Sequence, residues 1–226
     1  MSNDNISFPQ VLAASVQDMK SSLSMLLSSL DVITDLQENL DDIQKQTHAS
    51  LHYEAARLNT EIFQLQLFHK LSKNDLVPQV DEHYLIDILQ EQLANCDSLL
   101  QIRGVDVELE CDEDFSWYFD SELIASLIYK TLVNCARYSQ GRIKLSAIED
   151  EGQLLISISD DGNGYPQFML EQAQLQKLPE QFNSTQLDFF CSRRIAELHT
   201  KQDDCGSLSI ANGGAYGGGL FQVRLP

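Results

Sequence analysis

Apolar residues recur along the first third of the chain in alternating steps of four and three positions. A first run begins at Leu12, and a second run extends from Leu51 to Leu71 before the polar stretch that leads to Pro78. This spacing lines up apolar side chains along the seam of a helix that packs in a coiled coil or bundle. We therefore expect two antiparallel helices, joined by a turn that the polar residues 39–50 do not locate further. The first run is Leu12, Val16, Met19, Leu23, Leu26, Leu30 and Ile33, and the second includes Leu51, Ala55, Leu58, Ile62 and Leu65.

A hairpin of two helices leaves part of its apolar face uncovered. Pairing with a second copy would bury that face in a four-helix bundle. The sequence therefore predicts a homodimer.

The pattern changes after Pro78, where short alternating runs replace the long helical seam. Strictly alternating residues 105–110 predict a strand, whereas 167–186 is glutamine-rich and poorly periodic, as in a long loop or broken helix. The expected order of helices and strands indicates an α+β sandwich with helices on one face of a mixed sheet. We thus expect two domains, a helical hairpin at 1–77 and an α/β sandwich at 78–226. Further expected elements are helices at 85–102, 120–139 and 187–199 and strands at 143–148, 154–159, 207–210 and 220–225. Residues 115–119 form a short apolar stretch that we assign to no element.

The composition narrows the partners that the protein can have. The 226 residues include 34 acidic and 15 basic side chains, a formal charge of −19, which opposes unaided binding to nucleic acid or to an anionic membrane. No apolar run approaches the roughly 20 residues of a membrane span, and the first residues lack the order of a secretion signal. We expect a soluble cytoplasmic protein whose partners are proteins or small molecules. Its cysteines, Cys96, Cys111, Cys135, Cys191 and Cys205, have no paired-ligand or redox spacing and are expected to be reduced and mostly buried.

Two histidines, His48 and His52, lie four positions apart and would share one helix face. Without a third ligand nearby, a pair of this kind is more often an ordinary surface feature than a metal site. The sequence predicts no metal motif among the histidines.

An acidic turn that follows the strand at 154–159 is the main candidate for ligand binding. Asp160 ends this strand and could accept a hydrogen bond from an exocyclic amine such as that of adenine, while Gly162 and Gly164 would let a ligand approach the backbone. Acidic glycine turns are also common in hairpins. This string alone therefore does not decide between a binding site and a plain turn.

Several segments together resemble the histidine-kinase family of two-component signalling. Leu132–Ser139 resembles the asparagine box of the catalytic domain, and Asp160–Gly164 resembles its first glycine box. Leu220–Pro226 is similar to the closing strand of that domain, and Leu51–Asp75 is similar to the second dimerisation helix. The resemblance covers nearly the whole chain and implies a helical dimerisation stem followed by a Bergerat-type ATPase domain.

The resemblance also implies roles for individual residues. Asn134 would hold a magnesium ion that bridges the phosphates of ATP or ADP, for which an amide oxygen is a suitable ligand. Tyr138 would pack on the adenine, and Asp160 would bind its amino group beside Gly162 and Gly164. Two plainer readings remain open, in which Asn134 caps or bridges within the helix layer and Tyr138 belongs to the core.

The first departure from the family concerns the phosphate acceptor. Family members carry a histidine in a His-Glu-Leu-Arg-Thr-Pro-Leu type string, and the counterpart here is Gln17–Leu23, with Gln17 at the acceptor position. An amide nitrogen is not a nucleophile comparable to imidazole. Gln17 is therefore not expected to accept a phosphoryl group.

The second departure concerns the phosphate-binding lid. The family's glycine-threonine-glycine-leucine-glycine string corresponds to Ser184–Asp188, which contains no glycine, and Lys130 stands where a further asparagine is usual. Gln186 and Asp188 are unfavourable where backbone amides should wrap an anion. We expect the adenine half of the site to be better preserved than the phosphate half, so that ATP or ADP with magnesium binds weakly if it binds.

These departures favour a degenerate, stand-alone member of the family without a sensor domain. It would act as a dimeric adaptor or regulator of a response-regulator receiver or a partner histidine kinase. One alternative is an active histidine kinase or phosphotransferase with an unorthodox acceptor, His48 or His52. Another is a receiver phosphatase in which Gln17, Asp18 and Ser21 orient a water molecule, although such a set is also ordinary for a solvated helix.

Overall fold

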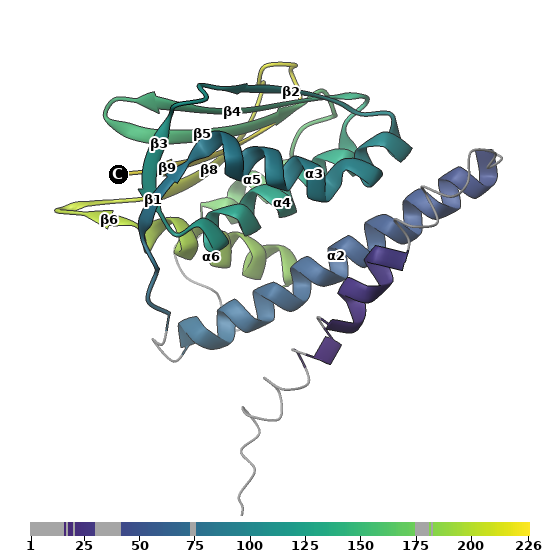
Figure 1. The fold of residues 1–226 in the computed structure, drawn as a ribbon, viewed down its shortest axis with the longest axis horizontal. Helices are drawn as coiled ribbons and strands as arrows, with labels where there is room; N and C mark the ends of the chain where they lie inside the picture. The colour runs from purple at the N-terminus through teal and green to yellow at the C-terminus, as the bar shows by residue number, and fades with distance from the viewer. Residues whose placement is uncertain are drawn as a thin grey trace, which may run out of the picture. The chain divides into compact units, whose positions relative to one another are not determined.

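The chain divides into two compact units, Met1–Leu76 and Val77–Pro226, in the computed structural model drawn in Figure 1. The structure describes residues 16, 18–19, 21–29, 42–72, 76–174, 181 and 183–226. None of the helices among these residues is long and apolar enough to cross a membrane.

The first unit is helical at every described residue as far as Ser72. Residues 21–29 are helical, and α2 spans Asp42–Ser72. Leu23 is buried against Ala55, and Leu27 and Ile62 pack around them. Because α2 already begins at Asp42, the turn that we expect before it is outside the described residues. The two helical segments thus meet through members of both predicted apolar runs.

Only part of the predicted seam is covered within the chain. Val16 and Leu23 are buried. Other members of the two runs are exposed by about half, namely Met19 (55%), Leu26 (48%), Leu51 (55%), Leu58 (45%) and Leu65 (50%). Each helix touches its neighbour along one side, so apolar residues on the adjacent side remain open to solvent.

The second unit contains a five-stranded sheet in the order β2-β4-β5-β9-β8. β2 and β4 run parallel, and the remaining neighbours are antiparallel. This mixed sheet with helices on one face (Figure 1) confirms the predicted α+β class. The strands are β2 (Asp106–Cys111), β4 (Arg142–Asp150), β5 (Gln153–Asp160), β8 (Ser207–Asn212) and β9 (Gly219–Leu225).

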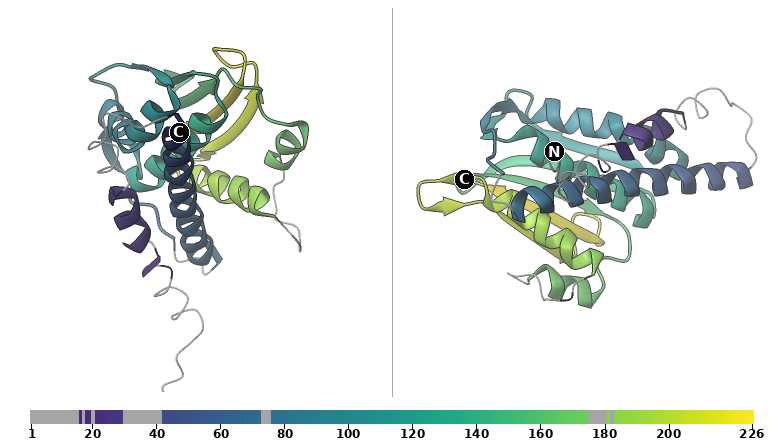
Figure 2. Two further views of the ribbon diagram at one scale, coloured as in Figure 1. Left: turned by 90° about the vertical axis from the view of Figure 1, so that its right-hand side faces the viewer. Right: turned by 90° about the horizontal axis from the view of Figure 1, so that it is seen from below.

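Capping residues define ends of the helices that cover the sheet. α3 spans Leu85–Arg103 and ends at Gly104, which adopts the left-handed φ of 65°. α4 spans Ser121–Tyr138 and begins after Asp120, whose side chain accepts a hydrogen bond from the Leu123 amide. α6 spans Ser184–Glu197 and lies next to β8, as Figure 2 shows.

The smaller elements were only partly foreseen. A short helix, α5 (Gln167–Ala173), occupies the start of the stretch that we expected to be a loop or broken helix. β3 (Ser116–Phe119) falls in the short apolar stretch that we assigned to no element, and it pairs with β1 (Asp81–Tyr84). β1 and the two-residue strands β6 (Thr200–Lys201) and β7 (Asp204–Cys205) had no predicted counterpart. Strands this short carry no readable periodicity.

A buried histidine joins the end of α6 to the start of α4. The Nε2 atom of His199 accepts a hydrogen bond from the amide of Asp120 at 2.9 Å, and Nδ1 lies 2.9 Å from the carbonyl oxygen of Ile195. These contacts require a neutral ring with the proton on Nδ1. Burial lowers the pKa of His199, outweighing the neighbouring carbonyls and the Asp120 carboxylate, which act to raise it.

Candidate functional site

Asp160, at the end of β5, is the central carboxylate of the candidate site, and its side chain is almost fully buried (8% exposed). Its Oδ1 accepts hydrogen bonds from the amides of Gly162 at 2.7 Å and Gly219 at 3.2 Å. The thiol of Cys135, on α4, lies 3.7 Å from Oδ2. Burial, and then the nearby Asp160, raise the pKa of Cys135 well above its ordinary value, so this group stays a thiol. Because a thiol is a weak donor, Oδ2 retains the capacity to accept a hydrogen bond from an amine.

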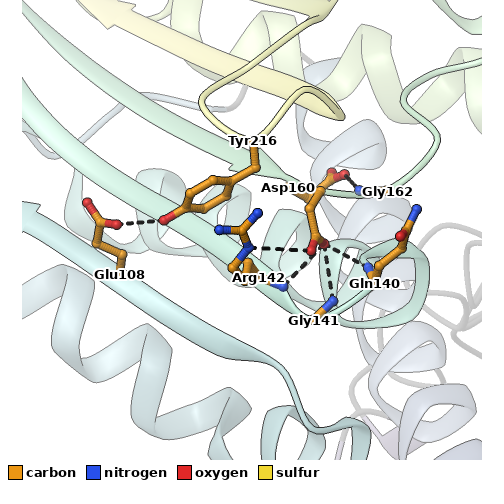
Figure 3. A network of polar contacts seen from close by, with 8 residues as sticks. Glu108, Gln140, Gly141, Arg142, Asp160, Gly162 and Tyr216 are labelled. Atoms are coloured by element: carbon orange, nitrogen blue, oxygen red, sulfur yellow. Dashed lines mark hydrogen bonds and ion pairs between the residues drawn. The ribbon is translucent and has the colours of Figure 1, made fainter.

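Asp161 organises the turn beside the site through contacts with Gln140, Gly141 and Arg142, which Figure 3 labels. Its Oδ1 accepts from the amides of Gln140, Gly141 and Arg142 at 2.7, 3.1 and 3.2 Å. The Arg142 guanidinium lies 3.8 Å from Oδ2. Partial burial acts to raise the pKa of Asp161, but the hydrogen bonds from these backbone amides outweigh it, so the pKa is lowered. A charged Asp161 therefore holds the segment that follows α4.

The two glycines of the acidic turn are required by the protein's own packing. A Cβ atom on Gly162 would collide with the carbonyl oxygen of Tyr138. Gly164 has a φ of +74°, and its Cβ would lie 2.6 Å from the side-chain oxygen of Asn212. That side chain bonds the amide and carbonyl of Tyr165 at 2.6 and 2.9 Å. Tight packing thus explains both glycines without a ligand.

Lys130, Asn134 and Tyr138 follow one another at intervals of four along one face of α4. Asn134 is exposed, and no hydrogen bond joins its side chain to another residue in the described part of the chain. Tyr138 is 64% exposed, with the Arg137 guanidinium 5.5 Å from its ring centre. The alternative reading of Tyr138 as a core residue is therefore wrong.

Lys130 forms an ion pair between α4 and α6. Its Nζ lies 2.5 Å from the carboxylate of Asp188 and 3.1 Å from the hydroxyl of Ser192. The Lys130 and Asp188 side chains are only 15% and 25% exposed. Both residues differ from the family pattern. Their opposite charges could have suggested an ion pair, which the sequence prediction missed.

The counterpart of the glycine lid, Ser184–Asp188, is the first turn of α6. Asn183 accepts from the Gln186 amide at 2.9 Å, and the Gln186 side chain accepts from the Asn183 amide at 3.0 Å. This reciprocal capping box satisfies two amides at the helix start that could otherwise bind an anion. With the Asp188 carboxylate in the same turn, these residues do not fit a magnesium–phosphate group.

The remaining candidates are placed only in part. Asp18 and Ser21 lie on helical, exposed positions of the first unit, whereas Gln17 lies outside the described residues. His48 and His52 fall within α2. Across the described residues, no group of three or more His, Cys, Asp or Glu side chains could hold a metal ion.

Comparison with curated proteins finds one relative, a sensor protein kinase. The chain is 26% identical over 176 residues to the sensor protein kinase CarS of Pseudomonas aeruginosa, a match that covers 75% of this chain. The chain spans 38% of the length of that kinase. No protein-family model matches the chain.

Solved structures give the same fold. The Acinetobacter baumannii histidine kinase AdeS has a TM-score of 0.59 at 15% identity and covers 91% of this chain and 95% of its own. Full-length ShkA in complex with AMPPNP has a TM-score of 0.62 at 14% identity, over 97% of this chain and 46% of its own. The catalytic domain of histidine kinase ThkA has a TM-score of 0.55 at 19% identity, over 66% of this chain and 96% of its own.

Proposed function

Since this chain is related to the histidine kinases in sequence and shares the fold of their catalytic domains, we propose that it is a degenerate histidine-kinase-like protein of two-component signalling. It acts in the cytoplasm by binding rather than by catalysis, as a dimeric adaptor or regulator. Its partner is a response-regulator receiver or a true histidine kinase.

The observation that carries the proposal is the ion pair between Lys130 and Asp188. The lysine charge is already neutralised by an internal carboxylate, and Ser192 takes part in the same contact. An incoming phosphate would have to displace Asp188 from a partly buried pair, and separating such a pair is costly. The capped start of α6 likewise offers fewer free amides to an anion.

The residue at the acceptor position of the helical stem also argues against phosphoryl transfer. Gln17 stands where family members carry the phosphorylated histidine, and an amide cannot replace imidazole as a nucleophile. The chain differs from the family at both the acceptor position and the phosphate-binding segment. We therefore infer that its kinase-like fold serves to bind a partner protein.

Dimerisation through the stem is supported by the spacing of its exposed leucines. Leu51, Leu58 and Leu65 follow at steps of seven along α2, so they lie on one helix face. All three are about half exposed. A second copy that packs along this face would complete a four-helix bundle.

The direct test is incubation of the full chain with radiolabelled ATP and magnesium. We expect no labelled protein, with and without a candidate receiver, while an active histidine kinase labelled in parallel serves as the positive control. Robust autophosphorylation would overturn the proposal.

Calorimetry provides an independent measurement of the nucleotide site. ATP, ADP and adenosine are titrated with and without magnesium, and Asp160→Asn serves as the control. The proposal predicts weak or absent binding, with little gain from the phosphates or from magnesium. Tight, magnesium-dependent ATP binding that Asp160→Asn abolishes would instead support an enzyme.

A receiver phosphatase is the second candidate, favoured by the exposure of Asp18 and Ser21 on the helical stem. An amide or hydroxyl there could orient water toward a phospho-aspartate on a docked receiver. The idea fails if Gln17→Ala leaves the decay of a cognate phospho-receiver at the wild-type rate. Phosphotransfer through His48 or His52 is tested separately, by substituting both residues.

A further inference from the structure

The turn between β8 and β9 has almost no side chains. Four of its six residues 213–218 are glycine, only Ala215 and Tyr216 differ, and β9 begins with a further glycine, Gly219. Glycine gives no preferred conformation, so fixing such a segment costs more conformational entropy than fixing other residues. Contacts of the turn with the rest of the protein must offset that cost.

Tyr216 makes those contacts on one side of the turn (Figure 3). Its hydroxyl donates to Oε2 of Glu108 at 2.6 Å, and the Arg142 guanidinium lies 4.4 Å from the centre of its ring. Glu108 belongs to β2, and β4 and β5 lie between β2 and β9 in the sheet. The turn therefore extends across β4 and β5 to reach Glu108.

The other side of the turn lies against Asp160. The Gly218 amide donates to the Asp160 carbonyl at 3.1 Å, and the Gly219 amide donates to Oδ1 at 3.2 Å. A Cβ on Gly218 would lie 2.5 Å from Oδ1, and one on Gly219 would lie 2.9 Å from Oδ2. Only glycine, which has no Cβ atom, allows the backbone to approach this carboxylate so closely.

The protonation states of Tyr216 and Glu108 favour the hydrogen bond between them. The Tyr216 hydroxyl, followed by Lys144, lowers the pKa of Glu108, and Glu108 raises the pKa of Tyr216. At neutral pH the acceptor is thus a carboxylate and the donor is a protonated phenol, a combination stronger than a neutral pair. Arg142 also donates its amide to Asp161, so one residue contacts both Tyr216 and the neighbour of Asp160.

We propose that Tyr216 is a positioning residue for Asp160. By fastening the glycine turn to Glu108 and Arg142, it holds the Gly218 and Gly219 amides against Asp160 and commits Oδ1 to the backbone. Oδ2 is then the oxygen that accepts from a ligand or partner. This role goes beyond the proposed function, because it concerns how Asp160 is held whether or not a nucleotide binds.

The test is amide hydrogen exchange, followed by NMR in the full chain, for Tyr216→Phe and Tyr216→Ala. Tyr216→Phe keeps the ring against Arg142 and loses the bond to Glu108. We expect exchange of the Gly218, Gly219 and Gly162 amides to accelerate about fivefold in Tyr216→Phe and about twentyfold or more in Tyr216→Ala. The carboxyl carbon signal of Asp160 shifts in parallel, while amides in the middle of β5 keep their exchange rates.

Tyr118→Phe is the matched control, since the Tyr118 hydroxyl also donates a solvent-exposed hydrogen bond to a glutamate, Glu82, at 3.4 Å in the β1–β3 ribbon. It should leave the three glycine amides and the Asp160 signal unchanged. The proposal is overturned if Tyr216→Ala leaves the Gly219 amide and the Asp160 signal at their wild-type values. Uniform acceleration across β5 would overturn it as well, because it would show general destabilisation rather than positioning.

Discussion

The ammonium group of Lys130 lies 2.5 Å from the carboxylate of Asp188, and each residue stands where the histidine-kinase pattern has an uncharged one. Lys130 without Asp188, or Asp188 without Lys130, would be a partly buried charge with no opposite charge beside it. Together they form a contact that includes Ser192. The contact between α4 and α6 at this point therefore depends on both residues together.

This dependence predicts a non-additive effect on stability. Lys130→Ala and Asp188→Ala should each lower the free energy of unfolding by about 1–2 kcal/mol, because each leaves its partner partly buried and unpaired. The double variant should cost little more than either single one. Urea denaturation of the four proteins measures the coupling.

A second ion pair provides the control for this cycle. Arg224 and Asp150 lie 2.7 Å apart on the sheet, with about a third of each side chain exposed. Their coupling should stay below about 1 kcal/mol, as in other solvent-exposed pairs. Equal coupling in the two cycles would count against a special role for Lys130 and Asp188.

His199 predicts loss of stability in mild acid. Its folded-state pKa is lowered from 6.5 by burial, so the unfolded chain binds the proton more readily. Its contribution is fully present above pH 6.5 and is lost as the pH falls below that value toward the folded pKa. Between pH 7.5 and 5.5 this group should remove about 1 kcal/mol from the free energy of unfolding.

The measurement compares urea denaturation of the wild type and His199→Gln at these two pH values. The substitution should flatten the pH dependence whatever it does to absolute stability. If the slope survives in His199→Gln, another group causes the acid sensitivity.

Asp161 predicts a distinction between two substitutions. Asp161→Ala removes the acceptor of three backbone amides and should cost about 2–3 kcal/mol, whereas Asp161→Asn keeps an acceptor oxygen and should cost less. Because the folded-state pKa of Asp161 is lowered from 3.8, its contribution is present above pH 3.8 and is lost below it. Acid titration of folding, followed by circular dichroism, should show a weaker dependence below pH 3.8 in Asp161→Asn.

The exposed leucines of α2 predict a change of oligomeric state. Leu58→Glu would place a charge in the interface that we propose between two copies, and should shift the protein from dimer to monomer in analytical ultracentrifugation at micromolar concentration. Ile148→Glu is the control, since Ile148 on β4 is equally exposed at 45%. A wild-type chain that sediments as a monomer would reject the dimer itself.

The sequence predicted the elements whose periodicity is strong and missed those defined by distant contacts. α4, β4 and β5 appeared near their expected positions, because buried residues such as Ile156 and Ile158 alternate regularly with serines. The alternation does not reveal that Gly219 approaches Asp160, since that contact depends on how β9 pairs with β5. The Lys130–Asp188 contact was hidden for the same reason, as it joins two helices distant in the chain. For Gly162 and Gly164, which we linked to ligand approach, the structure instead supplies a packing reason.

The capping box at the start of α6 has a consequence for substitutions toward the glycine lid of the histidine-kinase pattern. Gln186→Gly would remove the hydrogen bond to the Asn183 amide and add a residue that disfavours helix. The Lys130–Asp188 contact would remain in place. Under the function that we propose, this single substitution therefore costs stability and brings no gain in nucleotide binding.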